Sequence, residues 1–412
     1  MKYLFLFLFL VSFLSSCSDR QRINPFDSKA LNDHEDSTKL ACVAGDGYVD
    51  LEWNLTHYRD IEGYNLLRRP ESMDQWQVLN DSILPQETTY FRDEYVENGE
   101  TYEYGLSLIV KNESEKIIGK AQLATPGPEI IWLADKGSGF IWKISPDGRS
   151  GHFARGQFGE INDLEINILD GSCWFVDGSS SRVSRIDIDG HVESFLTDLD
   201  TVVDIEIDGE EGLGWILDIS RRKVFSFKLS IGDSLELIAV DANFDQPSGL
   251  ASFGGSCWIV DGLQKRILLY SQTNKKKIEF NGIDRPSAIF TDSSGDGWVI
   301  IEEGKKITQL KFDGTKKDFN LPFVGALGIS GNVDDDFIWL FSKNKLFRLT
   351  TKGDLLREWV DLPQVKSIAV DKRSNAVWVA MGQKLWKIGD SDQIMSVLSG
   401  FSSLGKIVVS SR

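Results

Sequence analysis

Seven tryptophans recur at a nearly constant spacing, and this spacing constrains the fold more than any other feature of the sequence. They are Trp132, Trp174, Trp215, Trp258, Trp298, Trp339 and Trp378, with successive separations of 42, 41, 43, 40, 41 and 39 residues. Each lies in a short apolar run typical of a β-strand. A period near forty with strand-like units predicts small antiparallel sheets that stack on one another.

Each repeat has the pattern of a four-stranded meander. The second repeat shows it most clearly, with expected strands at Asn162 to Ile166, Cys173 to Asp177, Arg182 to Ile186 and His191 to Leu196. The Asp189-Gly190 pair before the last strand suits a tight hairpin that needs positive φ.

The two ends of the repeat array complement each other. The first repeat begins with its tryptophan strand, Ile130 to Asp135, and lacks an inner strand, whereas the chain ends with a lone strand pattern from Gly405 to Ser410. We expect the last strand to complete the first sheet, because this closes a ring and removes exposed sheet edges. Residues 130–412 are therefore expected to form a seven-bladed β-propeller.

The repeats resemble those of the broad propeller families named NHL and YVTN. The shared core is Trp-Leu-Ala-Asp at 132–135, Trp-Phe-Val-Asp at 174–177, Trp-Ile-Leu-Asp at 215–218 and Trp-Ile-Val-Asp at 258–261. The last three repeats differ, with Ile301, Ser342 and Met381 at the position of the aspartate. The resemblance implies the propeller fold and indicates little about function.

Residues 40–126 alternate apolar and polar side chains in short runs, which is typical of a β-sandwich. The stretch resembles a fibronectin type III domain, with Trp53 on the second strand and Gly99-Glu100-Thr101-Tyr102 near the end. By this resemblance Tyr102 is the buried corner tyrosine, and the module serves as a spacer or a binding unit. Thr125-Pro126-Gly127-Pro128 then forms a short stiff linker.

The N-terminus has the order of a secretory signal, with Lys2 before an apolar stretch from Tyr3 to Phe13. Leu14-Ser15-Ser16-Cys17 resembles the lipobox of bacterial lipoproteins, which implies a signal peptide at 1–16, acylation of Cys17 and a polar lipidated tether at 17–39. Acyl chains would anchor the protein to a membrane. Ser18 after the cysteine resembles the pattern of outer-membrane lipoproteins, so we expect a bacterial cell-envelope protein, lipid-anchored in the outer membrane.

Composition excludes one class of partner. The formal net charge of −17 and the absence of a lysine or arginine cluster argue against nucleic-acid binding. Cys42, Cys173 and Cys257 are expected to be unpaired buried thiols, because Cys173 and Cys257 occupy equivalent positions two blades apart and are too distant for a disulfide.

Propeller enzymes place their sites where the inner strands begin, so candidate site residues are expected at these positions. They are Asn162-Asp163, Val203-Asp204, Ser248-Gly249, Ser287-Ala288, Gly325-Ala326, Lys366-Ser367 and Gly405-Lys406. Asp163, Asp204, Lys366 and Lys406 are the candidate ligand contacts on this central face. No catalytic residue, cofactor or metal ligand set is predicted, because the propeller histidines, His152 and His191, are expected on outer strands. A Ca²⁺ site formed by Asp163, Asp204 and neighbouring backbone carbonyls is an alternative interpretation.

Basic residues open six of the third strands: Arg182, Lys223, Arg266, Lys306, Lys345 and Lys384. They fit either a charged rim for an anionic or sugar ligand, or ordinary cross-strand pairing at the surface.

Three functions fit these observations. The first is a binding or scaffolding lipoprotein whose propeller holds a protein or glycan. The second is a propeller lyase or lactonase with a central metal site, resembling streptogramin lyase or the gluconolactonases. The third is a structural envelope component. The missing inward histidines favour a protein that is not an enzyme, and the sequence does not indicate an oligomeric state.

Overall fold

A computed structural model describes residues 39–54, 61–111, 115–153, 156, 158–179, 182–195, 199–229 and 235–411. Within these ranges every regular element is a β-strand, and no helix is long and apolar enough to cross a membrane. The chain is an all-β protein. Cys17, the expected signal peptide and nearly all of the expected tether lie outside the described residues.

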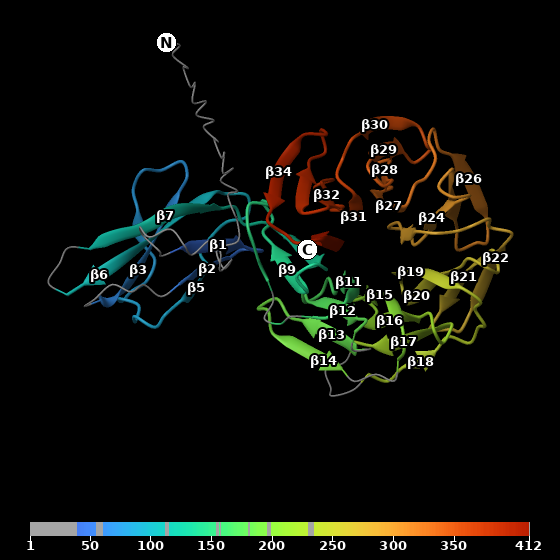
Figure 1. The fold of residues 1–412 in the computed structure, drawn as a ribbon, viewed down its shortest axis with the longest axis horizontal. Coiled ribbons are helices and arrows are strands. Elements are labelled where there is room, and N and C mark those ends of the chain that lie inside the picture. The colour runs from blue at the N-terminus through green and yellow to red at the C-terminus, as the bar shows by residue number, and fades with distance from the viewer. Residues whose placement is uncertain are drawn as a thin grey trace, which may run out of the picture.

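Seven four-stranded antiparallel sheets, the blades, are arranged in a ring around a central channel (Figure 1). Blade 1 contains β8 (Glu129–Asp135), β9 (Phe140–Ile144), β10 (Gly151–Phe153) and β35 (Leu404–Ser411). Blade 2 contains β11 (Ile161–Ile166), β12 (Cys173–Asp177), β13 (Arg182–Ile186) and β14 (Val192–Phe195). Blade 3 contains β15 (Val202–Asp208), β16 (Leu213–Asp218), β17 (Lys223–Lys228) and β18 (Ile238–Ala239). Blade 4 contains β19 (Pro247–Phe253), β20 (Ser256–Asp261), β21 (Arg266–Ser271) and β22 (Lys277–Asn281). Blade 5 contains β23 (Ile289–Thr291), β24 (Gly297–Ile301), β25 (Lys306–Leu310) and β26 (Lys316–Asn320). Blade 6 contains β27 (Gly328–Asn332), β28 (Phe337–Phe341), β29 (Leu346–Thr350) and β30 (Leu355–Trp359). Blade 7 contains β31 (Val365–Val370), β32 (Val377–Met381), β33 (Lys384–Ile388) and β34 (Ile394–Ser399).

The last strand closes the ring as the sequence predicts. β35 pairs antiparallel with β8, with Val408 opposite Trp132. A buried ion pair supports the same junction, because Lys387 Nζ of blade 7 lies 2.6 Å from Glu129 Oε2 of blade 1. Blade 1 is therefore built from both ends of the array.

The repeat tryptophans lie on the second strands and are at most 3% exposed. Trp258 packs beside Phe280 of its own blade and Phe312 of blade 5, and its indole N–H donates to the carbonyl of Gly295. One large ring thus fills the space between two neighbouring sheets. This packing explains why the tryptophan recurs once per blade.

The aspartate after the tryptophan strand holds the loop that leads into the inner strand. Asp218 accepts hydrogen bonds from the backbone N–H groups of Asp200 and Thr201, and Asp261 does the same for Asp245 and Gln246. Such bonds satisfy loop N–H groups that have no strand partner. Blades 5 to 7 lack this aspartate, in agreement with their different sequences.

The N-terminal strands form two further sheets with one shared core. The first has the order β1-β2-β5 and the second β4-β3-β6-β7. The strands are β1 (Leu40–Ala44), β2 (Val49–Trp53), β3 (Ile61–Pro70), β4 (Gln77–Val78), β5 (Tyr90–Asp93), β6 (Tyr102–Val110) and β7 (Lys116–Ala124). Their buried residues, including Trp53 and Tyr104, belong to a single cluster. In Figure 1 these sheets lie beside blades 1 and 2.

Polar contacts join the N-terminal sheets to the ring. The Ser150 hydroxyl donates to the Cys42 carbonyl at 2.6 Å, and Lys143 Nζ of β9 donates to the Tyr48 hydroxyl at 2.5 Å. Arg92 reaches Asp189 of blade 2 at 2.8 Å. Cys42, Cys173 and Cys257 are all free and buried, which confirms the prediction of unpaired thiols.

Several predicted strand starts were misplaced, including that of the fifth inner strand, which begins at Ile289 instead of Ser287-Ala288. The sixth inner strand begins at Gly328, whereas the sequence suggested Gly325-Ala326. Gly325 adopts φ +82, so this segment turns before the strand begins. The last strand of blade 2 starts at Val192 instead of His191, and Lys345 lies one residue before β29.

Candidate functional site

An irregular start recurs on the inner strands. The pairing register shifts between Ile161 and Asp163 in β11, and between Val202 and Asp204 in β15. Similar shifts occur in β19, β31 and β35. A bulge of this kind redirects side chains at the end of a strand and is common beside functional sites. Here it lies at the strand starts that line the central channel.

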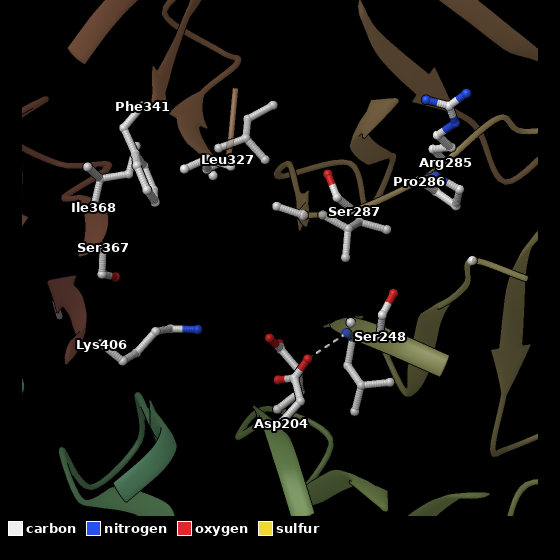
Figure 2. Close-up of a pocket in the computed structure, with 18 of the residues that line it drawn as sticks. Asp204, Ser248, Arg285, Pro286, Ser287, Leu327, Phe341, Ser367, Ile368 and Lys406 are labelled. Carbon is white, nitrogen blue, oxygen red and sulfur yellow. Dashed lines mark hydrogen bonds between the residues drawn. The ribbon is translucent and has the colours of Figure 1, made fainter. Parts of the chain in front are cut away.

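A cavity of about 750 Å³ lies at this end of the channel (Figure 2). Three of the four predicted contacts line it, namely Asp204, Lys366 and Lys406. Asp163 lies beside the cavity, where its Oδ1 atom is 3.0 Å from Lys406 Nζ. The structure therefore gathers Asp163, Asp204 and Lys406 in one cluster and places Lys366, which is exposed, among the cavity-lining residues.

Two residues that sequence reasoning missed complete this charged side of the cavity. Glu206 lines the cavity two residues after Asp204, and Glu165 stands in the same relation to Asp163. Because alternate residues of a strand share a face, each Asp-x-Glu pair points both carboxylates toward the channel. The repeated Asp-x-Glu pattern in blades 2 and 3 was the sequence signal that could have revealed them.

The charged side holds four carboxylates and one lysine, and their proximity shifts several pKa values. Burial raises the pKa of Glu165 to about 7, opposed in part by Lys406. Burial and the neighbouring Asp163 raise the pKa of Asp204, and burial with Glu165 and Asp204 raises that of Glu206. Burial lowers the pKa of Lys406, but the surrounding carboxylates outweigh it and hold the value above the usual range.

The same carboxylates bind the next inner strand. Asp163 Oδ2 accepts from the N–H of Ile205 at 3.2 Å, and Asp204 Oδ2 accepts from the N–H of Leu250 at 2.8 Å. Glu206 Oε2 accepts from the N–H of Ser252 at 3.1 Å. These N–H groups lie on the strand edge that faces the channel and have no fifth strand to pair with. Each carboxylate thus has a structural partner besides any ligand.

Apart from Arg285 and Lys366, most of the remaining lining of the cavity is apolar. Leu263, Pro286, Leu327, Phe341 and Ile368 form this apolar side, with Leu263 66% and Leu327 57% exposed. Figure 2 shows Leu327 and Phe341 across the cavity from Asp204 and Lys406. Small residues stand where blades 1 to 3 carry charges: Gly249, Ala288, Gly328 and Ser367. These small side chains leave the space that forms the cavity.

The histidines of the ring lie away from the channel. His152 is on β10 and is half-buried near Lys143, and both burial and that lysine lower its pKa to about 4. His191 precedes β14 and bonds Asp187 at 3.0 Å. In the part of the chain that the structure describes, no three His, Cys, Asp or Glu side chains are grouped to hold a metal ion.

Arg266, Lys306 and Lys345, three of the six basic residues of the third strands, form ion pairs within their own blades. Arg266 pairs with Asp261 at 3.4 Å, and Lys345 pairs with Glu358 at 2.8 Å. None of the six, all of which are described, lines the cavity.

Comparisons with known proteins bear on the fold. No family model and no curated protein sequence matches the chain. A functionally unknown protein from Desulfotomaculum acetoxidans is similar over 68% of this chain and 99% of its own, with 13% identity and a TM-score of 0.56. A streptogramin B lyase matches 61% of this chain and 87% of its own, with 15% identity and a TM-score of 0.53. Apo AztD from Citrobacter koseri matches 68% and 97%, with 15% identity and a TM-score of 0.52.

These structures define the class of the protein, an all-β chain that contains a β-propeller. At such low identities the likeness concerns the fold alone, because one fold hosts many functions. The function must be argued from the cavity and its two unlike sides.

Proposed function

We propose that this protein is a lipid-anchored binding protein of the bacterial cell envelope, and that its partner binds in the central cavity of the propeller. The observation that carries the proposal is the cavity of about 750 Å³, which has charged groups on one side and apolar side chains on the other. A concave site with a few convergent polar groups among apolar residues is the usual form of a binding site.

The envelope location rests on the sequence at Leu14-Ser15-Ser16-Cys17. In this proposal residues 1–16 are removed, Cys17 carries the acyl chains, residues 17–39 form the tether, and the protein faces its partner from the outer membrane. Multiple acyl chains would make the attachment durable.

The proposed division into an N-terminal fibronectin type III module at 40–126 and a propeller at 130–412 has support from the strand order of the two N-terminal sheets. The Tyr102 hydroxyl accepts from the N–H of Glu97 at 3.1 Å, as a corner tyrosine would. The contact of Lys143 with Tyr48 of this module, and that of Arg92 of the module with Asp189 of the ring, suit a spacer that holds the propeller in one orientation.

The alternative is a propeller lyase or lactonase with a central metal site, favoured by the fold that the chain shares with a streptogramin B lyase. Such a site needs several converging ligands. Among the described residues none are so grouped, and the ring histidines lie away from the channel. The binding function therefore has the stronger support.

Site-specific photo-crosslinking in bacteria tests the binding proposal. A photoreactive residue at Leu327, beside the cavity, should capture one defined envelope partner. A matched position at Leu356, which is 54% exposed on the outer strand β30, should not. Capture at Leu356 alone, or at neither position, would contradict a partner in the cavity. Cys17→Ala should release the protein from the membrane fraction, and unchanged fractionation would contradict the anchor.

A further inference from the structure

The charge at the base of the cavity is unbalanced. Asp163, Glu165, Asp204 and Glu206 face a single lysine, Lys406, which lies against Asp163. Buried charges are stable only when they are paired or neutralised. A positively charged group that reached Asp204 and Glu206 would supply the missing partner.

The cations at the edge of the cavity do not supply it. Arg285 forms ion pairs with Glu303 and Asp284 on the surface of blade 5. Lys366 lines the cavity but is exposed to solvent. Among the described residues, neither forms an ion pair with Asp204 or Glu206. The carboxylates therefore remain the dominant charges on the side of the cavity that Asp204 and Glu206 line.

The apolar side distinguishes a protein ligand from a glycan. Its members are aliphatic except for Phe341, which is only 8% exposed, so no open aromatic face is offered for a sugar ring. Leu263 and Leu327 instead expose aliphatic surface beside the cavity, and Val324, three residues before Leu327 in the sequence, is 67% exposed. Aliphatic surface of this kind gains free energy by covering apolar side chains of a partner.

Building on the proposed function, we infer that the cavity receives a segment of a protein partner that carries a lysine or arginine side chain flanked by apolar residues. The basic side chain reaches the carboxylates of Asp204 and Glu206, and its apolar neighbours pack on Leu263 and Leu327. The cavity volume of about 750 Å³ accommodates a few side chains. Charge complementarity fixes the position of the segment, and apolar contact supplies area.

Short peptides test this inference on the intact protein without its lipid. The probe is acetyl-Leu-Lys-Leu-amide, compared by calorimetry with analogues that carry norleucine or glutamate in place of lysine. A charge-assisted contact of about 1.5–3 kcal/mol should make the lysine peptide bind about tenfold to a hundredfold more tightly than the norleucine peptide. Maltotriose and chitotriose serve as the glycan arm.

Variants separate ligand contact from strand support. Asp204→Asn with Glu206→Gln keeps an acceptor oxygen for the N–H groups of Leu250 and Ser252 and should abolish the preference for lysine. Asp208→Asn is the matched control, because Asp208 lies on the same strand and accepts from the N–H of Gly255 at 2.8 Å, yet does not line the cavity. This control should keep the preference.

The inference is overturned if the three peptides bind equally, if the glutamate peptide binds best, if none binds, or if only a trisaccharide binds. The preference measured on the unaltered protein decides the matter even if a variant fails to fold. Capture of a partner at Leu327 without any preference for lysine would leave the binding proposal intact and reject the basic segment. Absence of capture at Leu327 would reject the binding proposal itself.

Discussion

Two clusters of charged side chains in this ring differ in their balance of positive and negative charge. At the ring closure, Glu129 and Lys387 are both at most 9% exposed and form one pair, and Lys387 also donates to the carbonyl of Pro146 at 2.7 Å. In the channel, four carboxylates surround Lys406, whose side chain is 35% exposed. The first cluster is built on one direct carboxylate–lysine pair, whereas the second sets four carboxylates against one lysine beside the central cavity.

The difference indicates what each cluster is for. A buried ion pair needs no ligand, because each charge already has a partner within the folded chain. In the unbalanced cluster, burial and the neighbouring carboxylates raise the pKa values of Asp204 and Glu206, so a further cation beside them would favour their charged forms. We therefore assign the closure pair to stability and the channel cluster to binding.

The largest effect is expected at the closure. Lys387→Met leaves the Glu129 carboxyl buried without its cation, which should lower the free energy of unfolding by about 3–5 kcal/mol at pH 7. Urea denaturation followed by circular dichroism measures it. The double variant Glu129→Gln with Lys387→Met should recover most of the loss, and an equal loss in both would show that packing, not charge, holds the junction.

Glu165→Gln should instead raise the free energy of unfolding. The unfolded side chain ionises near pH 4.5, whereas the folded one has a pKa of about 7, so folding stability falls as pH rises between these values. Removing the carboxylate, which faces Asp163, Glu206 and Lys406, should raise the free energy of unfolding by about 1–3 kcal/mol at pH 8 and leave it unchanged at pH 4.

The exposed Glu193→Gln, on the outer strand β14 of the same blade, is the matched control for this experiment and should show no such dependence. A loss of stability at pH 8, or an equal gain at both pH values, would mean that Glu165 is not held away from its charged form.

Lys406→Met should cost less than Lys387→Met, because the channel admits solvent and the acids can take up protons. We expect a loss of about 1–2 kcal/mol at pH 8 that disappears near pH 4. The same variant should bind the lysine peptide more tightly, since the internal cation that competes for the carboxylates is gone. Weaker peptide binding in a folded variant would mean that Lys406 itself contacts the ligand.

The smallest effect is expected on the third strands. Lys345→Ala removes an exposed ion pair with Glu358 and should change the free energy of unfolding by no more than about 0.5 kcal/mol. It should leave peptide affinity unchanged. A large change in affinity would revive the charged rim as part of the binding surface.

The fold was predictable because one tryptophan per blade is a packing requirement that the sequence records directly. The channel contacts Asp163, Asp204 and Lys406 were predictable because they begin inner strands. Glu165 and Glu206 were missed because only the first residues of the inner strands were considered, although each follows a channel aspartate by two residues and therefore shares its face of the strand. The apolar side was also missed, since Leu263, Phe341 and Ile368 come from different blades and meet only in the folded ring.

Proton release on binding tests the central claim most directly. Calorimetry of acetyl-Leu-Lys-Leu-amide at pH 7, in two buffers with different heats of ionisation, gives the number of protons exchanged. A cation beside Asp204 and Glu206 lowers their raised pKa values, so binding should release protons, and fewer protons should be released in the Asp204→Asn with Glu206→Gln variant. Binding without proton release, or with proton uptake, would contradict the claim that a ligand cation binds beside the carboxylates of the channel cluster.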